Sequence, residues 1–233
     1  MTISSSRFVN TIIIYMLIIF FHEKMIDFFY KIHLFLNYIL RYNYIDNKKS
    51  ATGYWDNTQR DTHVVCNDLK KYLLSYYKKT NISNVLDLGC GIGSYIKYLR
   101  ENGIDAIGVD KIDNIEYIEN KDLTKPYFNP KSYVQTFEVG EHIPKEYENI
   151  FVDNICNNAK YGIIMSWALP GQGGDGHINE KNLTDIIKLI ENKGFKLNKD
   201  ETNKIRNSIK PLPHFLYFRQ NLLVFNRVQN KCK

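Results

Sequence analysis

The stretch Val85-Leu-Asp-Leu-Gly-Cys-Gly-Ile-Gly93 joins a run of apolar residues to three closely spaced glycines, and helical spacing resumes over Tyr95–Glu101. This order predicts a buried strand, a tight turn and a helix. Because glycine has no Cβ atom, the backbone of such a turn can approach a ligand closely, and the first turn of the helix offers free N–H groups. We therefore expect a ligand site at this turn; the alternative is a turn that binds nothing.

Apolar strands and helical segments alternate on both sides of this turn. Strands are expected at Asn84–Leu88, Ala106–Val109, a short segment ending near Asp122, Tyr133–Glu138, Gly162–Ala168, Phe195–Asn198 and Leu222–Asn226. Helices are expected at Asp61–Lys78, Tyr95–Glu101, Lys145–Ala159 and Leu183–Asn192. Such alternation predicts an α/β fold whose parallel sheet is covered by helices on both faces. Ligands of such sheets bind at the carboxyl ends of the strands.

The composition is that of a globular protein with one α/β domain and an appendage. Of the 233 residues, 44% are hydrophobic and 24% are charged, and the formal net charge of +6 does not by itself indicate a nucleic-acid partner. The four cysteines are widely spaced and form no Cys-x-x-Cys pair, so neither a zinc site nor a disulfide framework is indicated. We divide the chain into an N-terminal segment, residues 1–50, and a main domain, residues 51–233.

Three carboxylates follow successive strands of the predicted sheet. Asp87 precedes the glycine turn, Asp110 ends the second strand and Asp122 lies farther on. A carboxylate before the turn disfavours a pyrophosphate and suits a positively charged amino group, while one after the second strand can accept hydrogen bonds from two ribose hydroxyls. Ser94 stands where a dinucleotide-binding fingerprint needs glycine or alanine. The pattern therefore disfavours a dinucleotide.

The stretch from Val85 to Gly93 closely resembles motif I of class I S-adenosylmethionine (SAM)-dependent methyltransferases. The resemblance extends from Tyr54 to Arg227 and implies a Rossmann-like, seven-stranded, mostly parallel sheet with an antiparallel last strand. It also implies SAM as the cofactor, with the ribose at Asp110. The SAM-binding residues that the resemblance implies are Asp87, Gly89, Cys90, Gly91, Gly93, Asp110, Asp122, Leu123 and Glu138, with Asp122 and Leu123 at the adenine.

A second polar cluster follows the fourth predicted strand, in Phe137-Glu-Val-Gly-Glu-His-Ile-Pro144. If the chain turns there, Glu138, Glu141 and His142 converge, and His177 can supply a fourth ligand to Mg²⁺ or Mn²⁺. The Glu-x-x-Glu-His spacing resembles that of small-RNA 3′-end 2′-O-methyltransferases and some quinone-precursor O-methyltransferases, where such residues bind a metal. Without a metal, the segment shapes the SAM pocket and His142 becomes a candidate general base. Glu141, His142 and His177 are the candidate catalytic residues in either case.

A glycine-rich loop, Ser166–Asn179, follows the fifth predicted strand. Four glycines in a short span cost much conformational entropy to order, which a merely connecting loop rarely uses. We expect a mobile lid over the methyl acceptor, with Trp167 and His177 facing the pocket. The alternative is a flexible exposed loop with His177 on the surface. His214 is a further candidate for contact with the acceptor.

The N-terminal segment contains an almost wholly apolar run, Phe8–Phe21, and helical spacing continues to about Leu40. A bilayer-spanning helix needs about 20 apolar residues, so the run is short for a membrane span. Three interpretations compete: a membrane anchor, a helical cap on the main domain, and a spurious upstream extension of the reading frame. Arg7 before the run would direct the rest of the chain across the membrane, whereas SAM is made in the cytosol. A cytosolic protein, membrane-associated through an interfacial helix at residues 8–21, avoids that conflict.

These features predict a SAM-dependent methyltransferase that transfers a methyl group to an oxygen or nitrogen acceptor, in a small molecule or an RNA. The enzyme would hold the acceptor in line with the methyl group and remove a proton from it. The alternatives are another transferase of the same fold, such as an aminopropyl transferase, and a non-catalytic SAM-binding or scaffolding module. A nicotinamide-dependent oxidoreductase is disfavoured by Asp87 and Ser94. Arginine-rich runs and base-stacking motifs are absent, which weakens the RNA alternative.

Overall fold

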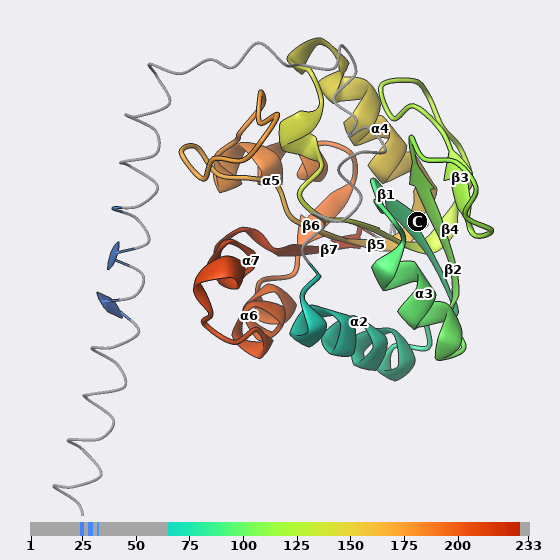
Figure 1. The fold of residues 1–233 in the computed structure, drawn as a ribbon, viewed down its shortest axis with the longest axis horizontal. Coiled ribbons are helices and arrows are strands. Elements are labelled where there is room, and N and C mark those ends of the chain that lie inside the picture. Colours follow the sequence, from blue (N-terminus) through green and yellow to red (C-terminus); the bar gives the residue numbers. More distant parts are fainter. Residues whose placement is uncertain (1–23, 26–27, 30–31, 33–64, 229–233) are drawn as a thin grey trace, which may run out of the picture. The chain divides into compact units, whose positions relative to one another are not determined.

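The computed structural model of the chain describes residues 24–25, 28–29, 32 and 65–228 (Figure 1). The chain comprises two compact units, residues 1–45 and 46–233. In the first unit, the described residues are helical, and Met25, Phe28 and Phe29 are exposed. The predicted apolar run Phe8–Phe21 lies outside the described residues, so its contact with a membrane stays a prediction. Within the described residues, no helix combines the length and apolar composition that a bilayer-spanning segment requires.

The second unit alternates strands with helices from residue 65 onward. Its strands are β1 (Asn84–Leu88), β2 (Asp105–Asp110), β3 (Ile118–Asn120), β4 (Lys131–Thr136), β5 (Ala159–Met165), β6 (Phe195–Leu197) and β7 (Leu223–Arg227). Its helices are α2 (Asn67–Lys79), α3 (Ser94–Glu101), α4 (Glu148–Asn158), α5 (Leu183–Glu191), α6 (Lys199–Ser208) and α7 (Leu216–Asn221). Short 3₁₀ turns form at Gly140–His142, Lys145–Tyr147 and Pro213–Phe215.

The strands form one seven-stranded sheet in the order β3-β2-β1-β4-β5-β7-β6. Strand β7 runs antiparallel to both β5 and β6, while the pairs from β3 through to β5 are parallel. This arrangement confirms the predicted Rossmann-like, mostly parallel sheet with an antiparallel last strand. The chain moves outward from β1 in one direction to β2 and β3, and in the other to β4 and β5. The switch point, where ligands bind in such sheets, therefore lies at the carboxyl ends of β1 and β4.

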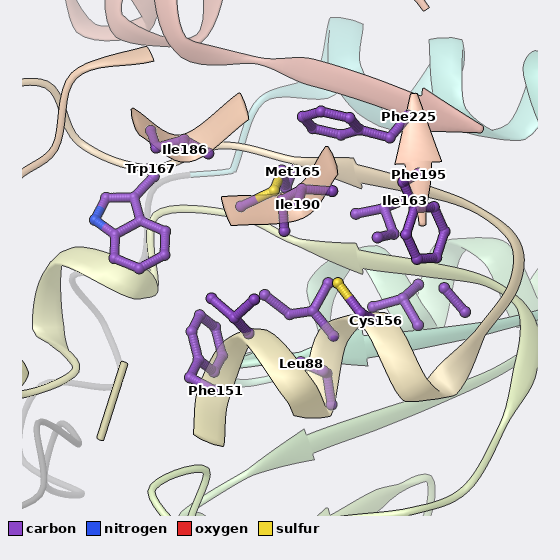
Figure 2. Close-up of a cluster of buried hydrophobic side chains, with 14 of the residues drawn as sticks. Leu88, Phe151, Cys156, Ile163, Met165, Trp167, Ile186, Ile190, Phe195 and Phe225 are labelled. Atoms are coloured by element: carbon purple, nitrogen blue, oxygen red, sulfur yellow. The ribbon is translucent and has the colours of Figure 1, made fainter. Parts of the chain in front are cut away.

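Helices cover both faces of the sheet, with α4 and α5 on one side and α2, α3 and α6 on the other (Figure 1). Side chains alternate between the two faces along each strand, so Leu86 and Leu88 pack toward α4, while Val85 packs toward α2. The cluster beneath α4 and α5 includes Phe151 and Phe225 (Figure 2). Burial of these apolar surfaces supplies the main stabilisation of the fold.

The structure differs from the sequence-based expectation at several boundaries. The fourth strand ends at Thr136 rather than at the predicted Glu138, because Glu138 takes a left-handed backbone conformation with φ 54° that cannot continue a strand. The fifth strand covers Ala159–Met165 rather than Gly162–Ala168. Helices α6 and α7 were not predicted. Helix α6 is mostly polar and buries only Thr202 and Ile205, so its sequence lacks the regular spacing of apolar residues that predicts a helix.

Phe151→Ala should lower the free energy of unfolding by about 3–5 kcal/mol, because it removes a fully buried ring from the core beneath α4. The matched control is Phe128→Ala, since the Phe128 ring is 73% exposed and its loss should change stability by less than about 0.5 kcal/mol. Urea denaturation followed by circular dichroism measures both. Equal losses in the two variants would contradict the assignment of this core.

Candidate active site

The glycine turn after β1 needs its glycines for two reasons. Gly89, Gly91 and Gly93 have φ values of 79°, 55° and 75°, in the left-handed region that other residues rarely adopt. A Cβ atom on Gly89 would also lie 2.4 Å from Cγ2 of Val139, and one on Gly93 would lie 2.8 Å from Cδ1 of Ile118. The turn therefore packs tightly against the segment that follows β4 and against the start of β3.

Asp110, at the carboxyl end of β2, is bonded to the glycine turn. Its Oδ2 accepts a hydrogen bond from the backbone N–H of Gly91 at 2.7 Å, and its Oδ1 accepts one from the N–H of Lys111 at 2.7 Å. Each carboxylate oxygen has a second lone pair and can accept a further hydrogen bond. Asp110 thus fixes the turn and can still accept from hydroxyl groups of a ligand.

Asp87, the last but one residue of β1, is a buried carboxylate. The residue is 2% exposed, and its Oδ2 accepts a hydrogen bond from Nε2 of Gln135 at 2.8 Å. Burial raises the pKa of Asp87 to about 7; the bond from Gln135 acts against this, and the charge of Asp110 adds to it. A cationic group bound beside Asp87 would favour the ionised form. Gln135 was not among the predicted site residues, because a buried amide in a strand carries no motif.

The remaining predicted cofactor residues lie around the same edge. Asp122 follows β3, and its Oδ1 accepts hydrogen bonds from the N–H and the hydroxyl of Thr124 at 2.9 and 2.6 Å. Leu123 is buried beside it. The sulfur of Cys90 packs against Gly108, where an added Cβ atom would lie only 2.4 Å from it. Asp122 therefore stabilises its own turn, and Cys90 stabilises the contact between the turn and β2.

Glu141, His142 and His177 come together in the structure. Glu141 and His142 belong to the 3₁₀ turn after β4, and His177 comes from the loop after β5. One ligand atom of each residue lies within 4.8 Å of the others. The two imidazole rings are 5.0 Å apart and nearly perpendicular. Of the four residues that the sequence was expected to bring together, the structure groups these three.

The carboxylate of Glu141 is incompletely bonded. The residue is fully buried, its Oε2 accepts a hydrogen bond from the N–H of Ala168 at 3.3 Å, and its Oε1 has no hydrogen-bond partner among the described residues. Oε1 lies 3.9 Å from Nε2 of His177. Burial, and then the charge of Glu138, raise the pKa of Glu141 well above its usual range. A buried oxygen of this kind needs a proton or a cation.

The two histidines are oriented by their Nδ1 atoms. Nδ1 of His177 lies 3.0 Å from Oε1 of Glu180, and Nδ1 of His142 lies 3.2 Å from the carbonyl oxygen of Gly176. A carbonyl and an ionised carboxylate only accept hydrogen bonds, so Nδ1 carries the proton in both contacts. In the neutral form of His177, its Nε2 atom would present a lone pair toward Glu141. Carboxylates that orient an imidazole in this way are common behind metal ligands.

Glu138 does not join the other three residues in this structure. Its Oε1 accepts a hydrogen bond from Nδ2 of Asn221 at 2.7 Å, its Oε2 accepts one from Gln172, and its N–H donates to Oγ of Ser166 at 3.0 Å. Burial raises the pKa of Glu138. The structure thus brings three of the four predicted metal ligands together, while the side-chain amides of Asn221 and Gln172 bind the carboxylate of the fourth, Glu138. Sequence reasoning missed Gln172, Asn221 and Glu180, since their roles depend on contacts between distant segments.

The segment that carries His177 is tied to the 3₁₀ turn below it. The N–H groups of Ile178 and Asn179 donate to the carbonyl oxygen of Glu141 at 2.8 and 2.9 Å. The side-chain amide of Asn179 donates to the carbonyl of Ile143 at 3.2 Å and to Oε2 of Glu148 at 3.0 Å. Asn179 is 6% exposed, so these bonds are shielded from water. They fix the position of His177 relative to Glu141.

The expectation that Trp167 faces the pocket as part of a lid is wrong. Trp167 is 1% exposed, its ring packs against Phe151 at 6.1 Å, and its Nε1 donates to the carbonyl oxygen of Asn179 at 2.7 Å. An indole is large and apolar, so it is better stabilised in the core once its N–H has a partner. The glycines of the loop are likewise held, because Glu180 accepts from the N–H groups of Gly171 and Gly173 at 2.7 and 2.8 Å.

His214 lies apart from the histidine pair. It belongs to the 3₁₀ turn Pro213–Phe215, its side chain is exposed, and its ring lies 4.2 Å from that of Phe215. The three cysteines in the described part of the chain, Cys66, Cys90 and Cys156, are free thiols. The polar residues that gather at the carboxyl edge of the sheet are therefore the carboxylates near the glycine turn and the cluster around Glu141.

Solved structures of SAM-dependent methyltransferases resemble this chain. Magnesium protoporphyrin IX methyltransferase from Synechocystis PCC 6803 with bound SAM is 17% identical, with a TM-score of 0.55 over 79% of this chain and 99% of that chain. The 1,6-didemethyltoxoflavin-N1-methyltransferase of Burkholderia thailandensis is 11% identical, with a TM-score of 0.54 over 74% of this chain and 83% of that chain. A SAM-dependent methyltransferase from Clostridium acetobutylicum is 10% identical, with a TM-score of 0.51 over 73% of this chain and 94% of that chain.

No protein-family model matches the sequence, and no curated protein matches it either. At identities this low, the likeness to solved structures shows a shared fold. The chain has the fold of SAM-dependent methyltransferases.

Asn179→Ala should loosen the His177 segment, because it removes two shielded side-chain hydrogen bonds. We expect a loss of about 2 kcal/mol in the free energy of unfolding and faster hydrogen exchange of the Ile178 amide. The control is Asn182→Ala, since Asn182 is exposed and its side chain does not cap α5. Exchange at Ile178 that is equally fast in both variants would contradict the anchoring role of Asn179.

Proposed function

We propose that the chain is a SAM-dependent methyltransferase that transfers a methyl group to an oxygen or nitrogen acceptor. The observation that carries this proposal is the convergence, at the switch point of a methyltransferase fold, of the glycine turn with Asp87 and Asp110. Asp87 is suited to the ammonium group of the methionine moiety, and Asp110 to the ribose hydroxyls. Asp122 and Leu123 are proposed at the adenine.

SAM, when bound, supplies a methyl group on a positively charged sulfur. The protein then needs to hold the acceptor atom in line with that methyl group, to exclude water and to take up the acceptor proton. Glu141, His142 and His177 lie after β4 and β5, next to the strand ends that would hold the cofactor. We assign the uptake of the acceptor proton to this cluster. An intact cluster of this kind argues against the alternative of a non-catalytic SAM-binding module.

A divalent cation fits the donor atoms of this cluster. The unpartnered Oε1 of Glu141 and the lone pair of His177 Nε2 face each other at 3.9 Å, and a cation would compensate both. We propose that Glu141, His142 and His177 hold Mg²⁺ or Mn²⁺, and that Glu138 becomes a fourth ligand only if its carboxylate leaves Gln172 and Asn221. Such an ion would supply Lewis-acid polarisation of an acceptor hydroxyl. An oxygen acceptor is therefore favoured over a nitrogen acceptor.

Asp110→Asn should weaken SAM binding by about 1.5–3 kcal/mol, because hydrogen bonds from the ribose hydroxyls lose a charged acceptor. The amide oxygen of the variant can still accept from Gly91, so the turn is retained. The control is Asp113→Asn, an exposed residue shortly after the same strand, and isothermal titration calorimetry measures all three proteins. Unchanged affinity in Asp110→Asn would remove the ribose assignment. Absence of SAM binding by the unmodified protein would remove the proposed function.

His177→Gln should lower the affinity of the chelator-treated protein for Mn²⁺ at least about tenfold, because the imidazole ligand and its orienting bond to Glu180 are lost. His214→Gln is the matched control, since His214 is exposed and lies in another segment. Calorimetry with Mn²⁺ alone gives the affinities. If the unmodified protein binds no Mn²⁺, the cluster acts through its own side chains, and the metal proposal is withdrawn.

A further inference from the structure

Three buried polar side chains form a continuous chain of hydrogen bonds from helix α2 to the proposed cofactor site. The hydroxyl of Tyr77 donates to Oε1 of Gln135 at 3.0 Å, and Nε2 of Gln135 donates to Oδ2 of Asp87 at 2.8 Å. Tyr77 and Gln135 are 0% exposed, and Asp87 is 2% exposed. Gln135 on β4 and Asp87 on β1 are register partners in adjacent strands, so the backbone fixes their spacing. Tyr77, on α2, bonds to Gln135 and not to Asp87, so it lies farther from the proposed cofactor than these two residues do.

This chain lies within an apolar layer. Tyr77, Val85 and Tyr133 all belong to the buried cluster between the sheet and α2, where apolar side chains would pack without any need for hydrogen bonds. Burying polar groups there is costly unless each one is paired. The described residues pair the Tyr77 hydroxyl and both ends of the Gln135 amide with one another and with Asp87. The donor end of this chain bonds more strongly to an ionised Asp87 carboxylate than to a neutral carboxyl group.

A hydrogen bond from the Tyr77 hydroxyl stabilises the orientation in which the NH₂ end of the Gln135 amide faces Asp87. A glutamine amide has a donor end and an acceptor end, and rotation of its last side-chain bond exchanges them. In the structure the Tyr77 hydroxyl donates to Oε1 of Gln135, and the NH₂ end of the amide points at Asp87. With the hydroxyl removed, the amide can rotate and present its oxygen to the carboxylate, which disfavours the ionised form. Among the described residues, Gln135 is the one hydrogen-bond partner of Asp87, so the second oxygen of Asp87 is available to a ligand.

We infer that Tyr77 is a positioning residue for the cofactor, which acts through Gln135 to keep the Asp87 carboxylate oriented toward the ammonium group of SAM. The inference rests on the proposed function, because it takes SAM as the ligand of Asp87. Tyr77 itself makes no contact with the cofactor in this assignment. Tyr77 acts on Asp87 through the side-chain amide of Gln135, whose orientation the Tyr77 hydroxyl stabilises.

The charges around Asp87 give the inference a pH dependence. Among the described residues, the titratable groups that interact with Asp87 are Asp110 on β2, Cys90 in the glycine turn, Tyr95 on α3 and Tyr77 on α2. Burial already raises the pKa of Asp87 to about 7, and the donor from Gln135 opposes that rise. Loss of an ordered donor therefore raises the pKa further. Since the cofactor ammonium binds the ionised carboxylate, SAM affinity should fall as the pH drops through this pKa.

The test compares two tyrosines of the same helix. Tyr77→Phe removes the hydroxyl that donates to Gln135. Tyr76→Phe removes a hydroxyl whose hydrogen-bond partner among the described residues is Tyr133, at 2.8 Å, rather than Gln135 or Asp87. Two quantities are measured: the midpoint of the Asp87 carboxyl titration by NMR in cofactor-free protein, and SAM affinity by calorimetry near neutral pH. We expect Tyr77→Phe to raise the midpoint and to weaken SAM binding roughly fivefold. Tyr76→Phe should leave both unchanged.

A third variant shows whether Tyr77 acts through Gln135. Gln135→Met removes both hydrogen bonds at similar volume, so it should raise the Asp87 midpoint at least as much as Tyr77→Phe does. Adding Tyr77→Phe to Gln135→Met should then cause no further change in midpoint or affinity. Additive effects would mean that Tyr77 acts on Asp87 by another route and would overturn the inference.

Two other results would overturn the inference as well. One is a Tyr77→Phe protein with the unmodified midpoint and affinity. The other is an equal shift in Tyr76→Phe, which would trace the effect to packing of α2. Failure of the proposed function has a different signature, because the unmodified protein would then bind no SAM although the Asp87 midpoint still moved in Tyr77→Phe.

Discussion

Parallel pairing of β1 with both β2 and β4 is the constraint on which the rest of the site depends. The chain leaves β1 toward one edge of the sheet and later returns to its other side, so the carboxyl ends of β1 and β4 open next to each other. The glycine turn and the segment after β4 therefore meet, as the contact between Gly89 and Val139 requires. Left-handed backbone and buried carboxylates are locally unfavourable, and the packed sheet below supplies the stability that offsets them.

The parts of the fold and site that could be predicted are those determined by residues close together in the sequence. The strand, turn and helix around Gly89 follow from apolar residues and glycines that are adjacent in sequence, and Glu141 and His142 are neighbours in the chain. The seven-stranded sheet with an antiparallel last strand was implied by the resemblance to methyltransferases. The position of Glu138 could not be foreseen, because it depends on the amides of Gln172 and Asn221 from two later segments. The predicted strand through Glu138 failed for the same reason, since tertiary bonds stabilise its left-handed backbone.

The loop after β5 shows how a glycine-rich sequence can be ordered. Its composition predicted mobility, yet the carboxylate of Glu180 collects two of its amides and the imidazole of His177. Burial opposes ionisation of Glu180, but these hydrogen bonds outweigh it and lower its pKa. Glycine suits these positions because it has no side chain, so that neighbouring backbone N–H groups can approach the same carboxylate. Trp167, near the start of the loop, is buried in the core.

The backbone carbonyl of Glu141 accepts from Ile178 and Asn179, which lie beyond the next strand of the sheet. The cluster of Glu141, His142 and His177 therefore depends on the pairing of β5 with β4, which brings the segment after β5 back to the 3₁₀ turn after β4. The glycine turn, in contrast, is bonded to Asp110 at the end of β2, so the two parts of the site depend on different pairs of neighbouring strands.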